Sequence, residues 1–199
     1  MSPRDRALLL VASLLTAYQI TFGIDDMCVI SISAYTIAFG ILLVASLLLI
    51  ILGFEVLNSP FVVILATILP LSLSFGLVWQ FLPAWYGLYL GFAGSGLLAV
   101  IMTRSISMLR NFSTIVLAVV HGIAGLVITI LPLVLVIQGS MPAGFALVSL
   151  GGALIGAVGL LLSFLKLGKP LLSRQQILSV LPGLLLLMTA AYVAGFAFA

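Results

Sequence analysis

Seven long apolar stretches, separated by short polar segments, constrain this chain more than any other feature. Most of them exceed the roughly 20 residues that a helix needs to cross a hydrocarbon core of about 30 Å. The predicted spans are Ala7–Gly23, Met27–Gly53, Pro60–Phe81, Tyr86–Met102, Phe112–Ile137, Ala143–Leu165 and Ile177–Ala199. Because such stretches are stable in lipid rather than in water, the sequence predicts a multi-pass membrane protein.

The spans are predicted to be helices rather than strands. A membrane strand alternates apolar and polar residues over about ten positions, whereas these stretches are apolar on every face. Charged residues make up only 6% of the chain, against roughly 25% in an ordinary soluble domain. We therefore expect an all-α membrane protein in which residues 1–199 form a single membrane domain, with no separate soluble domain.

Positive charges gather in three of the short polar segments. They are Arg4 and Arg6, then Arg104 and Arg110, and finally Lys166, Lys169 and Arg174. With seven spans these segments all lie on one side, together with Glu55, while Asp25 and Asp26 lie on the other. Excess Lys and Arg in short loops marks the cytoplasmic side. The sequence therefore predicts a plasma (cell inner) membrane protein with a cytoplasmic N-terminus and an external C-terminus.

The first span also has features of a secretory signal peptide, because Arg4 and Arg6 precede its apolar stretch. No clear small-x-small cleavage site ends the stretch, and Tyr18, Gln19 and Thr21 stand there instead. We expect an uncleaved first helix. If it were cleaved, six helices with the same sidedness would remain.

Two stretches of the chain resemble each other when one is shifted by 82 positions. Under this shift Gly40 aligns with Gly122, and Pro60 aligns with Pro142. The alignment pairs spans one to three with spans four to six, and an odd number of spans per unit makes the second unit inverted. Inverted repeats recur in transporters, with the binding site near the midplane. The sequence thus favours a 3+3 inverted repeat plus a seventh helix; the alternative is a bundle without internal symmetry.

Small residues form stripes on two of the predicted helices. Such stripes let helix backbones approach closely inside a membrane bundle. We therefore predict that they mediate helix packing. The residues are Gly87, Gly91 and Ser95 in the fourth span, and Ser149, Gly152, Gly156 and Gly159 in the sixth.

His121 is the only ionisable residue deep within a predicted span. It lies nine positions beyond Phe112, or about 13 Å along a helix axis. Ionisable side chains at such depth often mark a functional site, so His121 is a candidate for proton transfer or solute binding. The alternative is a neutral imidazole that is hydrogen-bonded to a hydroxyl or carbonyl of a neighbouring helix.

A second candidate site lies at the predicted outer turn between the first two spans. Its carboxylates would attract a cation; the alternative is a charged turn that keeps the loop in water. The candidate binding residues there are Tyr18, Gln19, Asp25, Asp26, Ser33 and Thr36.

Several classes of protein are disfavoured by the residues that the sequence contains. The single cysteine, Cys28, excludes an internal disulfide, and a lone histidine cannot form a bis-histidine haem site or a three-histidine zinc site. The run Gly91–Gly96 resembles the nucleophile turn of intramembrane serine proteases, but close helix packing accounts for its glycines. We expect no enzyme activity, no cofactor, no bound metal and no nucleic-acid partner.

Two functions remain open. One is a small-solute or ion transporter or channel, with a path between the repeats near His121. The other is a non-catalytic membrane subunit of a larger complex. The predicted partners are the lipid bilayer and either other membrane subunits or further copies of this chain.

Overall fold

The computed structural model describes residues 1–25, 27–166 and 173–199, and this part of the chain is helical with no strand. The predicted all-α fold is therefore confirmed. The α-helices are α1 (Pro3–Phe22), α2 (Val29–Leu52), α3 (Pro60–Phe81), α4 (Tyr86–Ser105), α5 (Ser113–Ile137), α6 (Ala146–Lys166) and α7 (Arg174–Phe196). Three short 3-10 helices connect them: η1 (Gly53–Asn58), η2 (Ser107–Phe112) and η3 (Ala143–Phe145).

Local capping residues explain where several helices begin and end. α1 starts at Pro3, four residues before the predicted span, because Ser2 and Asp5 form a capping box. α7 starts in the same way, with a capping box formed by Ser173 and Gln176. Gly23, Gly53 and Gly139 follow the ends of α1, α2 and α5 with φ values of 76°, 71° and 71°, a conformation that glycine adopts without steric cost.

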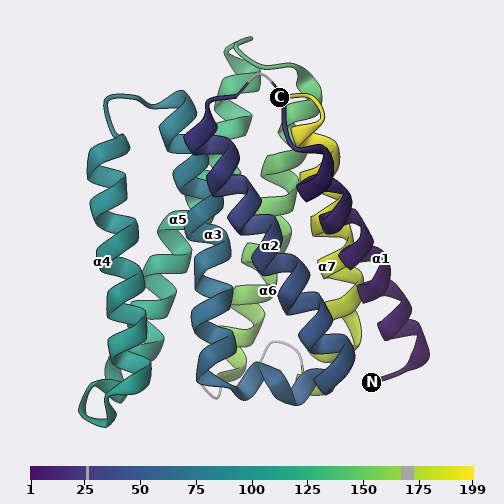
Figure 1. Ribbon diagram of the computed structural model, residues 1–199. Coiled ribbons are helices and arrows are strands. Elements are labelled where there is room, and N and C mark those ends of the chain that lie inside the picture. Colours follow the sequence, from purple (N-terminus) through teal and green to yellow (C-terminus); the bar gives the residue numbers. More distant parts are fainter. Residues whose placement is uncertain (26, 167–172) are drawn as a thin grey trace.

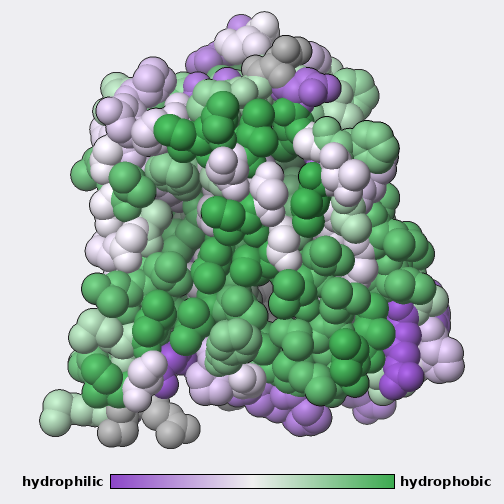
Figure 2. All heavy atoms as spheres, in the orientation of Figure 1, coloured by the Kyte–Doolittle hydropathy of each residue, from purple (hydrophilic) through white to green (hydrophobic). Residues whose placement is uncertain are grey.

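Five helices of the described chain are long and apolar enough to cross a membrane. They are Val29–Asn58, Pro60–Phe81, Tyr86–Ser105, Ser113–Ile137 and Arg174–Phe196. Large apolar side chains also face outward, with Phe22 at 70% and Ile137 at 75% exposure. Hydrophobic residues cover the middle of the visible surface and hydrophilic residues gather at its two ends (Figure 2). These features are those of a multi-pass helical membrane protein.

Six helices form a closed ring, and the seventh lies outside it. Going around the ring, α1 packs on α2, α2 on α3, α3 on α5, α5 on α6, α6 on α7, and α7 closes the ring on α1. α4 lies at one side of the bundle (Figure 1), where it packs mainly on α3 and α5.

Two hydrophobic clusters follow from this arrangement. The larger one fills the centre of the ring and takes residues from α2, α3, α5, α6 and α7. The smaller one joins α4 to the ring and contains Leu71, Val100, Val120 and Ala124. The interior of the ring is therefore packed with side chains.

The chain ends lie at opposite ends of the bundle (Figure 1). The N-terminus, η1 and the start of α7 share one end, where Arg174 and Glu55 approach to 3.8 Å. Both side chains are exposed, so this ion pair contributes at most about 1 kcal/mol to stability. It does show that Glu55 lies beside a basic segment, as the charge pattern indicated.

Candidate functional site

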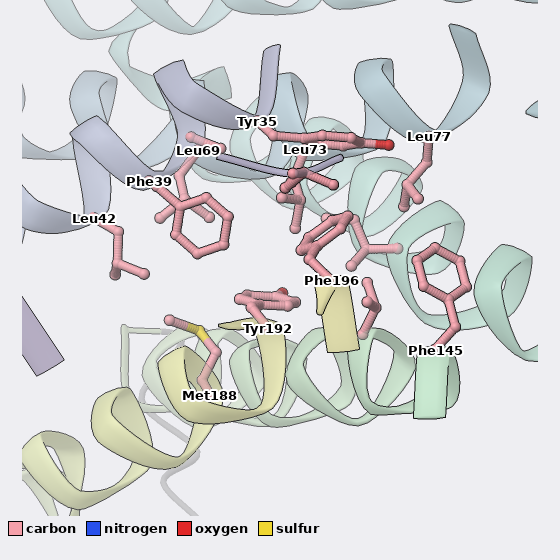
Figure 3. Packing of buried hydrophobic residues seen from close by; sticks show 14 of the residues in the cluster. Tyr35, Phe39, Leu42, Leu69, Leu73, Leu77, Phe145, Met188, Tyr192 and Phe196 are labelled. Atoms are coloured by element: carbon pink, nitrogen blue, oxygen red, sulfur yellow. The ribbon is translucent and has the colours of Figure 1, made fainter. Parts of the chain in front are cut away.

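The centre of the ring is a seam between two layers of helices, α2 with α3 and α6 with α7 (Figure 3). We use the term central seam for the buried side chains that meet there. From α2 and α3 they are Tyr35, Phe39, Leu42, Leu69, Leu73 and Leu77. From the opposite layer they are Phe145, Met188, Tyr192 and Phe196.

Aromatic rings close the middle of the central seam. The ring of Phe196 lies 4.6 Å from that of Tyr35 and 6.0 Å from that of Phe39, measured between centroids. Phe145 packs on the same residue at 6.1 Å. Phe196 of α7 therefore links the two layers by contacts with both.

Two tyrosine hydroxyls are buried in the seam without a hydrogen-bond partner in the described chain. Tyr35 and Tyr192 are each 1% exposed, and neither hydroxyl has a partner. An unpaired buried polar group costs roughly 1–3 kcal/mol. Most buried polar groups in proteins are paired, so two such hydroxyls in one apolar seam call for an explanation.

A glycine on the adjacent helix makes room for each of these tyrosines. A Cβ at Gly76 of α3 would overlap the ring of Tyr35, and one at Gly151 of α6 would lie 2.6 Å from the ring of Tyr192. Each ring therefore lies flat against the backbone of its own layer. Side chains at either glycine would push the tyrosine into the seam.

Two small cavities adjoin the seam. One is lined by Ala38, Phe39, Leu42, Leu69, Leu73 and Tyr192 and has no room for a water molecule. The other lies at the end of the bundle opposite the N-terminus and is lined by Gln19, Gly23, Ile24, Ile32, Tyr35, Thr36 and Phe39. The second has a volume of about 10 Å³, enough for about one water molecule.

The structure brings together two of the predicted binding residues, Gln19 and Thr36, in this second cavity. Gln19 is buried, and its Nε2 donates a hydrogen bond to the carbonyl of Gly23 at 2.6 Å. The hydroxyl of Thr36 donates to the carbonyl of Ile32, in its own helix. Both side chains are thus already engaged in local hydrogen bonds.

The other predicted outer residues lie apart from this cavity. Tyr18 is 52% exposed and stacks on Phe22 with a centroid distance of 4.5 Å. Asp25 is exposed, and the hydroxyl of Ser33 donates within its own helix to Val29. Asp26 lies outside the described residues.

His121 lies neither in the central seam nor near the outer residues. It is half-buried on α5, and its Nδ1 lies 3.1 Å from the carbonyl of Leu117 in the same helix. The hydrogen-bonding partner of His121 is therefore a backbone carbonyl of its own helix.

The two stripes of small residues occupy different environments. In α6, a Cβ at Gly152 would lie 2.8 Å from Oγ1 of Thr129, so α5 and α6 approach closely there. Ser149 is buried, while a Cβ added at Gly156 would meet no atom within 4 Å in the described part of the chain.

In α4, Gly87, Gly91 and Ser95 lie on an exposed face. A Cβ at either glycine would meet no neighbour within 4 Å in the described chain. This stripe therefore does not mediate packing inside the described bundle, because α4 turns its other face toward α3 and α5.

Polar links between helices concentrate on α3. The backbone N–H of Cys28 donates to Oε1 of Gln80 at 3.0 Å, and the hydroxyl of Ser31 donates to the carbonyl of Gly76 at 3.1 Å. From the other side, the hydroxyl of Tyr89 donates to Oγ of Ser74 at 2.7 Å. α3 is thus held by hydrogen bonds to both α2 and α4.

Sequence reasoning missed most of the seam. Tyr192, Gly76 and Gly151 were not singled out, because aromatic and glycine residues are common in membrane helices. A usable signal was a tyrosine inside an otherwise apolar span, since its hydroxyl needs a partner in lipid.

Comparisons of the chain with protein-family models, with curated proteins and with solved structures find no match. Among the described residues no group of three His, Cys, Asp or Glu side chains could hold a metal ion. The geometry of the ring and its central seam is therefore the evidence that bears on function.

Proposed function

We propose that this protein is a transporter or channel for a small solute, and that the solute passes along the central seam. The observation that carries the proposal is the pair of unpartnered hydroxyls of Tyr35 and Tyr192 inside a closed ring of six helices. Such hydroxyls are costly in a static apolar core. They become useful when a passing solute supplies the missing hydrogen bonds.

The composition of the seam indicates which solutes suit it. No charged residue is among the buried residues of the described chain, whose buried polar groups are the hydroxyls of serine, threonine and tyrosine and the amide of Gln19. A bare ion would lose its hydration there without compensation. The proposed solute is therefore small, uncharged and able to form a few hydrogen bonds.

The proposed topology has seven spans. It adds α1 and α6 to the five helices that meet the length and apolarity criteria, since α1 has 20 residues and α6 has 21. The start of α1, the end of α4 and the start of α7 lie at the N-terminal end of the bundle (Figure 1), and these segments carry Arg4, Arg6, Arg104 and Arg174. By the positive-inside rule this end faces the cytoplasm of a plasma membrane and the C-terminus lies outside.

The ring supports a different repeat from the one that the sequence favours. Exchanging α1, α2 and α3 with α5, α6 and α7 maps each contact of the ring onto another: α1–α2 onto α5–α6, α2–α3 onto α6–α7, and α3–α5 onto α7–α1. Pairing α1–α3 with α4–α6 instead leaves the extensive α3–α5 contact without an equally extensive α6–α2 counterpart among the described residues.

A shift of 116 positions supports the new pairing, because it places Tyr35 on Gly151 and Gly76 on Tyr192. The contact of Tyr35 with Gly76 in the first unit thus corresponds to the contact of Gly151 with Tyr192 in the second, with tyrosine and glycine exchanged between the two helices. We favour two parallel three-helix units joined by α4, an arrangement in which transporters carry the solute site between the units.

Replacing Tyr35 or Tyr192 with phenylalanine should reduce solute flux and raise stability at the same time. Each change removes an unpaired buried hydroxyl, so the free energy of unfolding should rise by about 1 kcal/mol. Flux of the transported solute should fall by about tenfold, because one hydrogen bond to it is lost. Tyr18→Phe, on the outer surface, should change neither quantity.

The measurement is stopped-flow flux of glycerol, urea and potassium into proteoliposomes, beside thermal unfolding of the same variants. Equal flux in wild type, Tyr35→Phe and Tyr192→Phe would show that the hydroxyls play no part in transport. If none of the solutes crosses faster than in empty liposomes, the transport proposal loses its support and the subunit alternative gains.

Cys28 offers a direct test of the proposed orientation. It caps the N-terminus of α2, is exposed, and is the only cysteine of the chain. Burial raises the pKa of its thiol, but hydrogen bonds with Ser31 and with the backbone of Ile30 outweigh this effect, so that the net shift is downward. The thiol is therefore well suited to react with maleimide at neutral pH.

A membrane-impermeant maleimide added to intact cells should label Cys28 at the external surface. Cys28→Ser provides the control for background labelling. Labelling that requires permeabilised cells would reverse the proposed orientation.

The second candidate is a non-catalytic subunit of a larger membrane complex, and the exposed small-residue face of α4 favours it. Gly87, Gly91 and Ser95 there would allow a partner helix to approach closely. The mass of particles extracted gently from the native membrane distinguishes the two functions. Stoichiometric foreign subunits would support the complex, and particles made of this chain alone would support the transporter.

A further inference from the structure

Ser46 continues the row of side chains that α2 directs into the ring. Tyr35, Phe39 and Leu42 point from α2 into the central seam (Figure 3). Ser46 follows Tyr35 by eleven positions and Phe39 by seven, spacings that return to the same face of a helix with 3.6 residues per turn. Ser46 is also buried, with 1% of its surface exposed. It therefore lies on the face of α2 that lines the seam.

The hydroxyl of Ser46 is unpaired although its own helix offers an acceptor. A serine or threonine inside a helix can donate to the carbonyl four residues earlier, which for Ser46 is that of Leu42. Ser46 Oγ nevertheless has no hydrogen-bond partner in the described chain. Other buried hydroxyls do donate to the carbonyl four residues earlier: those of Ser13, Thr16, Thr67, Ser74, Thr103 and Thr189.

Ser149 is the other buried serine whose hydroxyl has no partner among the described residues. It lies in the first turn of α6, and the residue four positions earlier, Phe145, belongs to η3. The geometry of a regular helix therefore does not apply to that acceptor. Ser46, in contrast, lies well inside α2, so the lack of a partner calls for another explanation there.

Ser46 and the seam tyrosines lie at different depths of the ring. Tyr35 is in the first third of α2, and Tyr192 is within the last two turns of α7, so both are nearer the end opposite the N-terminus. The eleven residues from Tyr35 to Ser46 correspond to about 16 Å along the helix axis, roughly half of a hydrocarbon core of about 30 Å. A small solute cannot contact both hydroxyls at once.

We propose that Ser46 forms a second hydrogen-bonding site for the transported solute, nearer the cytoplasmic end of the ring than the tyrosines. This inference rests on the proposed function and extends it, because a solute that leaves Tyr35 and Tyr192 binds next at Ser46. A serine hydroxyl both donates and accepts hydrogen bonds. It therefore suits small uncharged polyols and amides, such as glycerol and urea, which carry both kinds of group.

Ser46→Ala should lower the flux of glycerol or urea into proteoliposomes by about three- to tenfold, because one hydrogen bond to the solute is lost. Thermal unfolding should show no loss of stability, since this hydroxyl has no partner in the described chain. A fall in the folding equilibrium constant of more than about threefold would reveal a partner within the protein and overturn the proposal.

Ser13→Ala is the matched control. Ser13 is also a buried serine, but its hydroxyl already donates to the carbonyl of Leu9 in its own helix. Its replacement should leave solute flux unchanged. Equal flux in wild type, Ser13→Ala and Ser46→Ala would show that Ser46 does not bind the solute.

Thiol reactivity tests the site without relying on flux. In a Cys28→Ser background, Ser46→Cys places a single thiol in the ring, and Val44→Cys places one on the outer surface, where Val44 is 44% exposed. The thiolate is the reactive form, and apolar surroundings suppress it. Methyl methanethiosulfonate, a small uncharged reagent, should therefore modify Ser46→Cys at least about tenfold faster than Val44→Cys. Equal rates would overturn the proposal.

The site and the proposed function fail in different ways. If Tyr35→Phe lowers the flux and Ser46→Ala does not, Ser46 lies off the path while the transport function stands. If the wild-type protein carries neither glycerol nor urea, the transport function fails, and the site at Ser46 fails with it.

Discussion

Replacing Gly195 with alanine should lower the free energy of unfolding by about 3 kcal/mol, at the upper end of what one extra methyl group costs in a packed core. Gly195 of α7 lies at a close approach of α6 and α7. An added Cβ would lie 2.7 Å from the backbone nitrogen of Val148 and 3.2 Å from the carbonyl carbon of Leu147. Because these neighbours are backbone atoms, no side-chain rotation can relieve the overlap.

The matched control for this change is Gly183→Ala in the same helix. A Cβ at Gly183 meets no atom within 4 Å in the described chain, so stability should stay the same or rise by up to about 1 kcal/mol from the better helix propensity of alanine. Both variants can be compared by thermal unfolding in detergent. Equal stability of Gly195→Ala and Gly183→Ala would contradict the close contact between α6 and α7.

Phe196→Ala should have an effect of similar size, a loss of about 3 kcal/mol. The Phe196 ring contacts aromatic rings from both layers of the central seam, so its removal leaves a cavity at the point where the layers meet. In a bilayer the burial of an apolar side chain between helices adds little hydrophobic free energy, because lipid is equally apolar. The loss therefore comes from van der Waals contacts, which a cavity in the seam cannot restore.

Phe61→Ala is the control, since Phe61 of α3 is 63% exposed on the outer surface. Lipid can replace most of its contacts, and the change should cost less than about 0.5 kcal/mol. Reversible unfolding by denaturant in mixed micelles measures both losses. A difference of less than 1 kcal/mol between the two variants would mean that Phe196 does not hold the layers together.

The positions of the helices could be predicted from the sequence because they depend on local properties. The span Pro60–Phe81 coincides with α3, and the other predicted spans differ from the helices by a few residues at their ends. These differences arise from caps such as the pair of Ser2 and Asp5. The placement of Glu55 beside the basic residue Arg174 likewise followed from the number and order of the spans.

The candidate site could be predicted only in part, because it depends on which helices touch. Gln19 and Thr36 do share a cavity, but Tyr18, Ser33 and Asp25 lie elsewhere, since residues near one turn point in different directions around two helices. The stripe of Gly87, Gly91 and Ser95 was recognisable, whereas the side of α4 that faces the ring was not.

By itself, the sequence determined that the chain suits a lipid environment, that it is helical, and how charged residues are distributed between the two ends of the bundle. Hydrophobicity, helix length and the side on which Lys and Arg lie depend on residues that are close together in the sequence. They can therefore be predicted without knowing any tertiary contact. Only the tertiary structure decided that α4 lies outside a ring of six helices, that Tyr35 and Tyr192 lie in its centre, and that the small residues of α4 face away from it. In an almost uniformly apolar chain every helix face is equally compatible with lipid, so steric fit and unpaired polar groups select the neighbours.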